Sequence, residues 1–212
     1  MSKIRLKICG LRDNIGEVAS LQPDYVGFIF YPKSPRYVGA GFRMPEFDRR
    51  IQKVGVFVNE PVESVLEKVR IYRLDFAQLH GSESPEVCDM IKNAGVGVIK
   101  ALQMGDNFDF SQLQQYNATV DYFLFDTKTK LYGGSGNAFN WEILKKYNMG
   151  KQYFLSGGIS LENLDGLYEV DLSKVHALDV NSKFEMKPGL KNIEKLERLK
   201  DFIIYNLGDG AS

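Results

Sequence analysis

The sequence has few of the features that mark secreted, membrane-spanning or nucleic-acid-binding proteins. Two cysteines in 212 residues cannot form a disulfide framework. The longest strongly apolar run, residues 25–31, is far shorter than the roughly 18 residues that a membrane helix needs, and the N-terminus lacks the apolar block of a signal peptide. Twenty-seven basic residues balance 27 acidic ones, so no net charge attracts nucleic acid or an anionic membrane. We therefore expect a cytoplasmic protein with no nucleic-acid partner and no membrane partner.

What the sequence does contain is an alternation of β-rich and helical segments along its whole length. β-branched and aromatic residues cluster in eight runs: residues 3–9, 25–30, 52–58, 75–79, 97–101, 122–126, 152–155 and 174–179. Apolar residues at helical spacing lie between several of these runs, and helix-start signals precede them at Asp13, Pro61 and Ser84. Eight repeats of about 26 residues account for the chain, which is the low end of the size range for a TIM barrel. We predict an α/β fold: one domain, residues 1–212, forming a (β/α)8 barrel of eight parallel strands that binds phosphate.

An open doubly wound sheet also alternates strands and helices, but a glycine-rich fingerprint usually follows its first strand. Here Cys9-Gly10-Leu11-Arg12 follows the first predicted strand, and neither residues 95–100 nor residues 133–139 complete the pattern GxGxxG. The count of eight repeats favours the barrel. In such a barrel the chemistry lies at the C-terminal ends of the strands, and this sequence places polar side chains after nearly every predicted strand.

Cys9, at the end of the first predicted strand, is a candidate base. Most free cysteines are small buried apolar residues, and we interpret Cys88 in that way because it lies in an apolar helical pattern. If the alternating apolar residues of the first strand face the helices, Lys7 and Cys9 both point into the barrel. The lysine ammonium is then expected to lower the thiol pKa from its usual value of about 8.5.

Asp126 ends an apolar strand, where an ionisable side chain is costly unless it is paired or functional. One interpretation makes it the structural partner of an inward lysine, either Lys7 or Lys100. The other makes it a general acid whose pKa is raised by apolar surroundings.

Three segments have the composition of anion-binding loops. Residues 156–160 and 179–182 follow the seventh and eighth predicted strands, where glycines and helix N-termini often hold phosphate in these barrels. Residues 131–136 form either a flexible linker or a lid. Arg36, after the second strand, is suited to hold a carboxylate in a bidentate pair. The histidines and cysteines show no metal-ligand spacing, so we expect no metal site.

Several short motifs occur along the chain in a characteristic order: Lys7-Ile8-Cys9-Gly10-Leu11, Ser34-Pro35-Arg36, Gln78-Leu79-His80-Gly81, Phe125-Asp126-Thr127, Gly133-Gly134-Ser135-Gly136, Ser156-Gly157-Gly158, Asp179-Val180-Asn181-Ser182 and Pro188-Gly189. Together they resemble the phosphoribosylanthranilate isomerase family of tryptophan biosynthesis. The resemblance implies the barrel fold and an isomerase that needs no cofactor. The implied reaction is the Amadori rearrangement of N-(5-phosphoribosyl)anthranilate to 1-(2-carboxyphenylamino)-1-deoxyribulose 5-phosphate.

The resemblance also implies a role for each candidate residue. Asp126 would protonate the ring oxygen of the sugar, Cys9 would remove the proton from C2, and Arg36 would bind the anthranilate carboxylate. The other implied binding residues are Gln78 and Asp179 for the substrate, and Gly157, Gly158, Asn181 and Ser182 for the phosphate. Lys183 stands where relatives often have glycine, which changes the backbone of the phosphate loop and adds a positive charge. The expected partner is this small-molecule substrate, and the expected assembly is a monomer or homodimer.

Two other kinds of function fit part of the pattern. Indoleglycerol-phosphate synthases and the related histidine-pathway isomerases are also phosphate-binding barrels. The first relies on a lysine and a glutamate, and the second has an aspartate where Cys9 stands. A catalytically silent metabolite-binding barrel would have no need of both Cys9 and Asp126.

Overall fold

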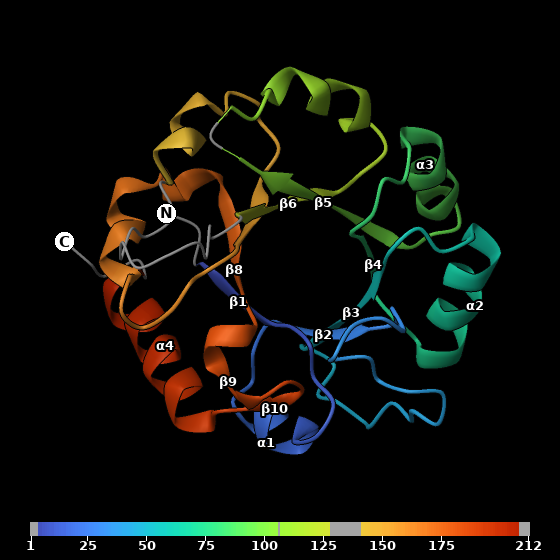
Figure 1. The fold of residues 1–212 in the computed structure, drawn as a ribbon, viewed down its shortest axis with the longest axis horizontal. Coiled ribbons are helices and arrows are strands. Elements are labelled where there is room, and N and C mark those ends of the chain that lie inside the picture. The colour runs from blue at the N-terminus through green and yellow to red at the C-terminus, as the bar shows by residue number, and fades with distance from the viewer. Residues whose placement is uncertain (1–3, 106, 128–140, 208–212) are drawn as a thin grey trace.

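Eight parallel strands close into a barrel, which confirms the predicted (β/α)8 architecture. The computed structural model describes residues 4–105, 107–127 and 141–207. The strands follow chain order around the barrel, and the last pairs with the first to close it (Figure 1). They are β1 (Arg5–Ile8), β2 (Tyr25–Ile29), β3 (Gln52–Phe57), β4 (Phe76–Leu79), β5 (Gly97–Met104), β6 (Tyr122–Thr127), β7 (Tyr153–Ser156) and β8 (Val175–Val180). Each overlaps one of the eight predicted runs, because parallel strands buried on both faces are rich in apolar residues.

Four α-helices lie outside the barrel in the described part of the chain (Figure 1): α1 (Ile15–Ser20), α2 (Val62–Tyr72), α3 (Pro85–Asn93) and α4 (Ile193–Asn206). Helix α1 begins after Asn14, one residue beyond the predicted start at Asp13. Helix α3 begins with Pro85, whose fixed φ suits the first helical position. Cys88 of this helix is buried, as expected. Met90, two residues later, faces solvent and is 54% exposed. None of these described helices has the length and apolar character needed to cross a membrane.

The connections after β5 differ from the predicted pattern because they contain short 3₁₀ segments. These are η1 (Phe110–Tyr116), η2 (Trp141–Lys146), η3 (Leu164–Glu169), η4 (Leu172–Lys174) and η5 (Ser182–Phe184). They lack the long amphipathic repeat that stabilises α2 and α4 as α-helices. The segment 131–136, predicted to be a linker or a lid, lies outside the described residues.

A small antiparallel hairpin follows η5 and lies beside the start of α1. It consists of β9 (Glu185–Lys187) and β10 (Leu190–Lys191). The side chain of Asn14 holds it through two hydrogen bonds to the backbone of Lys191, at 2.9 and 3.0 Å. This contact joins the end of the barrel to its beginning and fixes the hairpin against the site described below.

The inside of the barrel is apolar over its N-terminal part. One cluster of buried residues fills it: Tyr25, Val54, Ile99, Ala101, Leu124, Phe154 and Ala177. The pairing of β7 with β8 shifts its register between Tyr153 and Phe154, which skips His176. His176 contacts the Tyr25 hydroxyl at 2.7 Å, so it belongs to this layer. Other polar side chains of the strands gather at the opposite, C-terminal end.

Candidate active site

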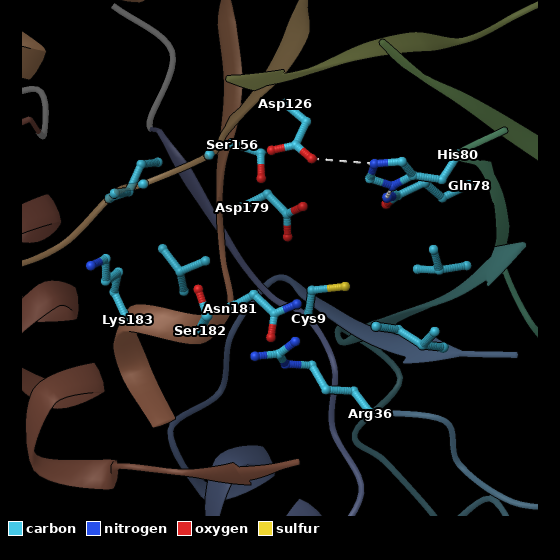
Figure 2. Close-up of a pocket in the computed structure, with 16 residues that line it drawn as sticks. Cys9, Arg36, Gln78, His80, Asp126, Ser156, Asp179, Asn181, Ser182 and Lys183 are labelled. Carbon is cyan, nitrogen blue, oxygen red and sulfur yellow. Dashed lines mark hydrogen bonds and ion pairs between the residues drawn. The ribbon is translucent and has the colours of Figure 1, made fainter. Parts of the chain in front are cut away.

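A cavity of about 360 Å³ opens at the C-terminal ends of the strands (Figure 2). All nine residues that the sequence predicted for the site line it: Cys9, Arg36, Gln78, Asp126, Gly157, Gly158, Asp179, Asn181 and Ser182. The remaining lining residues are Ile29, Val56, His80, Ser156, Ile159, Val180 and Lys183. Residues far apart in sequence meet here because the parallel strands all end on the same side of the barrel.

Lys7 lies under this cavity and is completely buried. It stands opposite Asp179 in the pairing of β1 with β8, and its Nζ atom lies 3.0 Å from Asp179 Oδ1. The same ammonium donates a hydrogen bond of 2.7 Å to Gln78 Oε1. Burial acts to lower the pKa of Lys7, but Asp179 and Cys9 raise it by more, so the net pKa is raised. The predicted inward orientation of Lys7 is confirmed.

The Cys9 thiol lines the cavity although its side chain is only 4% exposed. Space for it comes from Gly27 of β2, because a Cβ atom there would lie 2.7 Å from Cys9 Sγ. The expectation that Lys7 gives this thiol a lowered pKa is wrong. Burial raises the pKa by more than Lys7 and Lys191 lower it, and Asp179 raises it further.

The Asp126 carboxyl stands at the open side of the cavity, where a third of its side chain is exposed. It faces His80, whose Nε2 atom lies 3.3 Å from Asp126 Oδ2. The predicted pairing with Lys7 or Lys100 is wrong, because Lys7 pairs with Asp179 and Lys100 with Glu83 at 2.8 Å. The apolar enclosure expected for Asp126 is absent as well, since the strand ends at the mouth of the barrel.

Arg36 reaches the cavity from the loop after β2, and a buried carboxylate holds it there. Its Nε atom lies 3.0 Å from both carboxylate oxygens of Glu185, and its Nη2 atom lies 2.7 Å from Oε2. Lys191 Nζ donates to Glu185 Oε1 at 2.8 Å and to Asn181 Oδ1 at 2.8 Å. Burial acts to raise the pKa of Glu185, but the hydrogen bonds from Arg36 and Lys191 lower it by more. Within the described ranges, Nη1 of Arg36 donates no hydrogen bond.

The segments after β7 and β8 form the side of the cavity opposite β4. Gly157 and Gly158 have φ values of +83° and +72°, which only glycine adopts without strain. The segments that follow are the 3₁₀ segments η3 and η5 rather than α-helices. The helix dipole expected for an anion at these positions is therefore small, and backbone N–H groups with Lys183 are the donors that remain.

The chain is similar to known proteins over nearly its whole length. Residues 6–201 match the family model of N-(5'-phosphoribosyl)anthranilate (PRA) isomerase. The chain belongs to this family. It is 42% identical over 209 residues to the PRA isomerase of Parabacteroides distasonis, covering 94% of this chain and 93% of that relative.

Solved structures of PRA isomerases agree with this assignment. The crystal structure from Thermotoga maritima matches with a TM-score of 0.79 and 33% identity, over 93% of this chain and 97% of that one. A PRA isomerase in complex with reduced 1-(o-carboxyphenylamino)-1-deoxyribulose 5-phosphate matches with a TM-score of 0.75 and 31% identity, over 95% and 97%. The resemblance inferred from the sequence motifs is confirmed.

Three charged or ionisable residues of the site had no role in the sequence prediction: His80, Glu185 and Lys191. His80 lies two residues after Gln78, so the alternation of side chains along a strand could have placed it on the same face. Glu185 is 149 positions from Arg36, and no local pattern signals their contact. Among the described residues, no group of three or more His, Cys, Asp or Glu side chains is arranged to hold a metal ion.

Proposed function

We propose that the protein isomerises N-(5'-phosphoribosyl)anthranilate to 1-(2-carboxyphenylamino)-1-deoxyribulose 5-phosphate, with Asp126 as the acid and Cys9 as the base. The observation that carries these roles is that a thiol and a carboxyl from distant strands line one cavity. The same cavity has a basic side chain, Arg36, and a glycine-rich loop, which suit the carboxylate and the phosphate of this substrate. The relative crystallised with the reduced product also supports it.

Asp126 carries out the first step in this proposal. Its carboxyl group gives a proton to the ring oxygen of the ribose, and the bond between C1 and that oxygen breaks. The lone pair of the anthranilate nitrogen forms a C=N double bond to C1, so the opened sugar is a Schiff base. Exposure at the cavity mouth lets Asp126 regain a proton from solvent after the step.

Cys9 carries out the second step. Its thiolate takes the proton from C2, the electron pair forms a C1=C2 double bond, and the nitrogen returns to the amine state. The resulting enolamine becomes the ketone when the C2 hydroxyl loses its proton and C1 gains one. In the free protein the raised pKa keeps Cys9 a thiol, so its own proton must first pass to solvent through the open cavity. The thiolate that is left is then a stronger base for this carbon acid.

The remaining site residues bind the two ends of the substrate. Arg36 presents Nη1 to the anthranilate carboxylate while Glu185 holds the rest of the guanidinium. Gly157, Gly158, Asn181 and Ser182, joined by Lys183, surround the phosphate. Gln78 and Asp179 are tied to Lys7 but still line the cavity, where they contact the sugar hydroxyls or the anthranilate amine.

The test is to mix the purified protein with freshly generated phosphoribosylanthranilate and to follow the loss of substrate fluorescence. Cys9→Ala and Asp126→Asn should each lower kcat by orders of magnitude while the melting temperature stays close to that of the unmodified protein. Cys88→Ala is the matched control, because Cys88 is the other buried thiol and lies in α3, away from the cavity. Full activity of either active-site variant would remove the assigned roles.

We also propose that the enzyme works in the cytoplasm as a monomer or homodimer, on a small-molecule substrate alone. Both cysteines are free thiols, which suits a reducing compartment. Light scattering coupled to size-exclusion chromatography measures the assembly directly, and a mass above that of two chains would contradict it.

A further inference from the structure

A chain of polar side-chain contacts crosses the floor of the cavity and ends on Asp126. Lys7 Nζ donates to Gln78 Oε1 at 2.7 Å, and Gln78 Nε2 lies 3.1 Å from His80 Nδ1. His80 Nε2 then lies 3.3 Å from Asp126 Oδ2 (Figure 2). The four side chains come from β1, from β4 and the residue after it, and from β6, so barrel closure brings them together.

The donors in this chain all point the same way. A lysine ammonium has no acceptor, so the oxygen of the Gln78 amide must face Lys7. The Gln78 NH2 group therefore faces His80, and because it is only a donor, Nδ1 of the neutral imidazole must accept. The ring hydrogen is then on Nε2, the ring atom that faces the Asp126 carboxylate at 3.3 Å. The buried ion pair with Asp179 keeps Lys7 charged and so fixes the direction of the whole chain.

We propose that His80 is a positioning residue for the acid Asp126, and that Gln78 selects the imidazole tautomer that it needs. This inference rests on the proposed function. Nε2 faces Oδ2 at 3.3 Å, and Figure 2 shows the other carboxylate oxygen turned away from His80, on the side of Ser156. A donor at Nε2 stabilises the carboxylate form of Asp126, which remains once Asp126 has protonated the ring oxygen.

The loop that carries His80 is held without its imidazole. The backbone N–H of His80 donates to the Phe57 carbonyl at 2.8 Å. Lys100 Nζ donates to the Gly81 carbonyl at 2.7 Å, and Glu83 accepts from the backbone N–H of Gly81 at 2.9 Å. Changing the His80 side chain should therefore leave the loop in place, so that its effect is on Asp126.

Kinetics of two His80 variants test the positioning role. His80→Leu removes the donor and should lower kcat about 10-fold to 100-fold with KM changed less than about 3-fold, because a hydrogen bond to a charged group is lost. His80→Gln places an amide NH2 near the position of Nε2 and should recover most of that loss. His176→Gln changes the other histidine of the chain, at the opposite end of the barrel, and should keep kcat. Equal losses in His80→Leu and His80→Gln, or a loss in KM alone, would overturn the proposal.

Nitrogen NMR tests the tautomer without relying on activity. The chain has two histidines, so the ring signals that remain in His176→Gln belong to His80. In the pH range where these ring signals no longer change with pH, we expect His80 to carry its hydrogen on Nε2. In Gln78→Met this preference should weaken. Hydrogen on Nδ1 in the unmodified protein, or an unchanged spectrum in Gln78→Met, would refute the inference even if the protein isomerises the substrate, and an inactive protein with the expected tautomer would refute only the proposed function.

Discussion

Replacing Glu185 by glutamine removes the carboxylate that holds two cations beside the site. The Glu185 side chain is 3% exposed, and it meets Arg36 Nη2 at 2.7 Å and Lys191 Nζ at 2.8 Å. Lys191 is completely buried, so in Glu185→Gln its charge keeps only Asn181 and a neutral amide as partners. Removing one member of a buried ion pair usually costs about 3–5 kcal/mol. We expect the lower end of that range, because the amide oxygen of glutamine still accepts one hydrogen bond.

The free energy of unfolding measured in urea checks this magnitude. Urea is uncharged and does not screen the ion pairs, as guanidinium would. With a slope of about 3 kcal/mol per molar urea, a loss of about 3 kcal/mol moves the midpoint by about 1 M. Glu60→Gln is the matched control, since Glu60 pairs with Lys68 at 2.8 Å but both side chains are 25% exposed. That variant should lose less than about 1 kcal/mol. Equal losses in the two variants would refute the reasoning from burial.

The pH dependence of the same difference gives a second check. The pKa of Glu185 in the folded protein is lowered: burial opposes this, but the hydrogen bonds from Arg36 and Lys191 exceed it. A lowered folded pKa stabilises the fold fully above the unfolded value of about 4.3, and this stability is lost as the pH falls through the folded pKa. The difference between the unmodified protein and Glu185→Gln should therefore be constant near neutral pH and shrink below about pH 4. A difference that grows on acidification would contradict the assigned direction.

Three further predictions follow from the site geometry. Arg36→Lys keeps the charge beside Glu185 but loses the planar fork, so KM should rise about 10-fold while kcat changes less; an unchanged KM would count against the carboxylate role. In a Cys88→Ala background, alkylation of Cys9 by iodoacetamide should be slow at neutral pH and should still accelerate above the usual thiol pKa of about 8.5, because the pKa of Cys9 is raised; a rate that levels off below that pH would show a lowered pKa. Gly27→Ala puts a Cβ atom 2.7 Å from Cys9 Sγ and should cost about 1–3 kcal/mol and lower kcat; full activity with unchanged stability would show that the thiol has other room.

The barrel and the residues that line its cavity could be predicted because both follow from the local pattern of apolar and polar residues. Eight apolar runs with β-branched and aromatic residues gave eight strands, and parallel strands end on one side whatever their separation in sequence. A polar residue at the end of a strand therefore faces the same opening as the others. The connections between β5 and β8 were less predictable, since their short segments fall between α-helix and 3₁₀ geometry and packing decides the outcome.

The partners of the charged residues could not be predicted because they depend on distances that a sequence does not contain. Asp126 meets His80, not a lysine, since Lys7 already faces Asp179 in the β1–β8 register. The pKa of Cys9 depends on a balance between burial and neighbouring charge, and the sequence shows only that Lys7 is near. The direction of the Cys9 pKa shift and the partner of Asp126 can both be read only from the closed barrel.

Two groups of charged side chains lie beside Cys9, and they differ in net charge. Beside Cys9, Lys7 faces one carboxylate, Asp179, so the pair is neutral and burial keeps the proton on the thiol. Arg36 and Lys191 form the second group and share one carboxylate, Glu185, and Lys191 lies close enough to Cys9 to act on its pKa. Two cations for one anion leave a surplus positive charge at the place where the anthranilate carboxylate is proposed to bind, and an anionic ligand there completes the pairing that Glu185 begins.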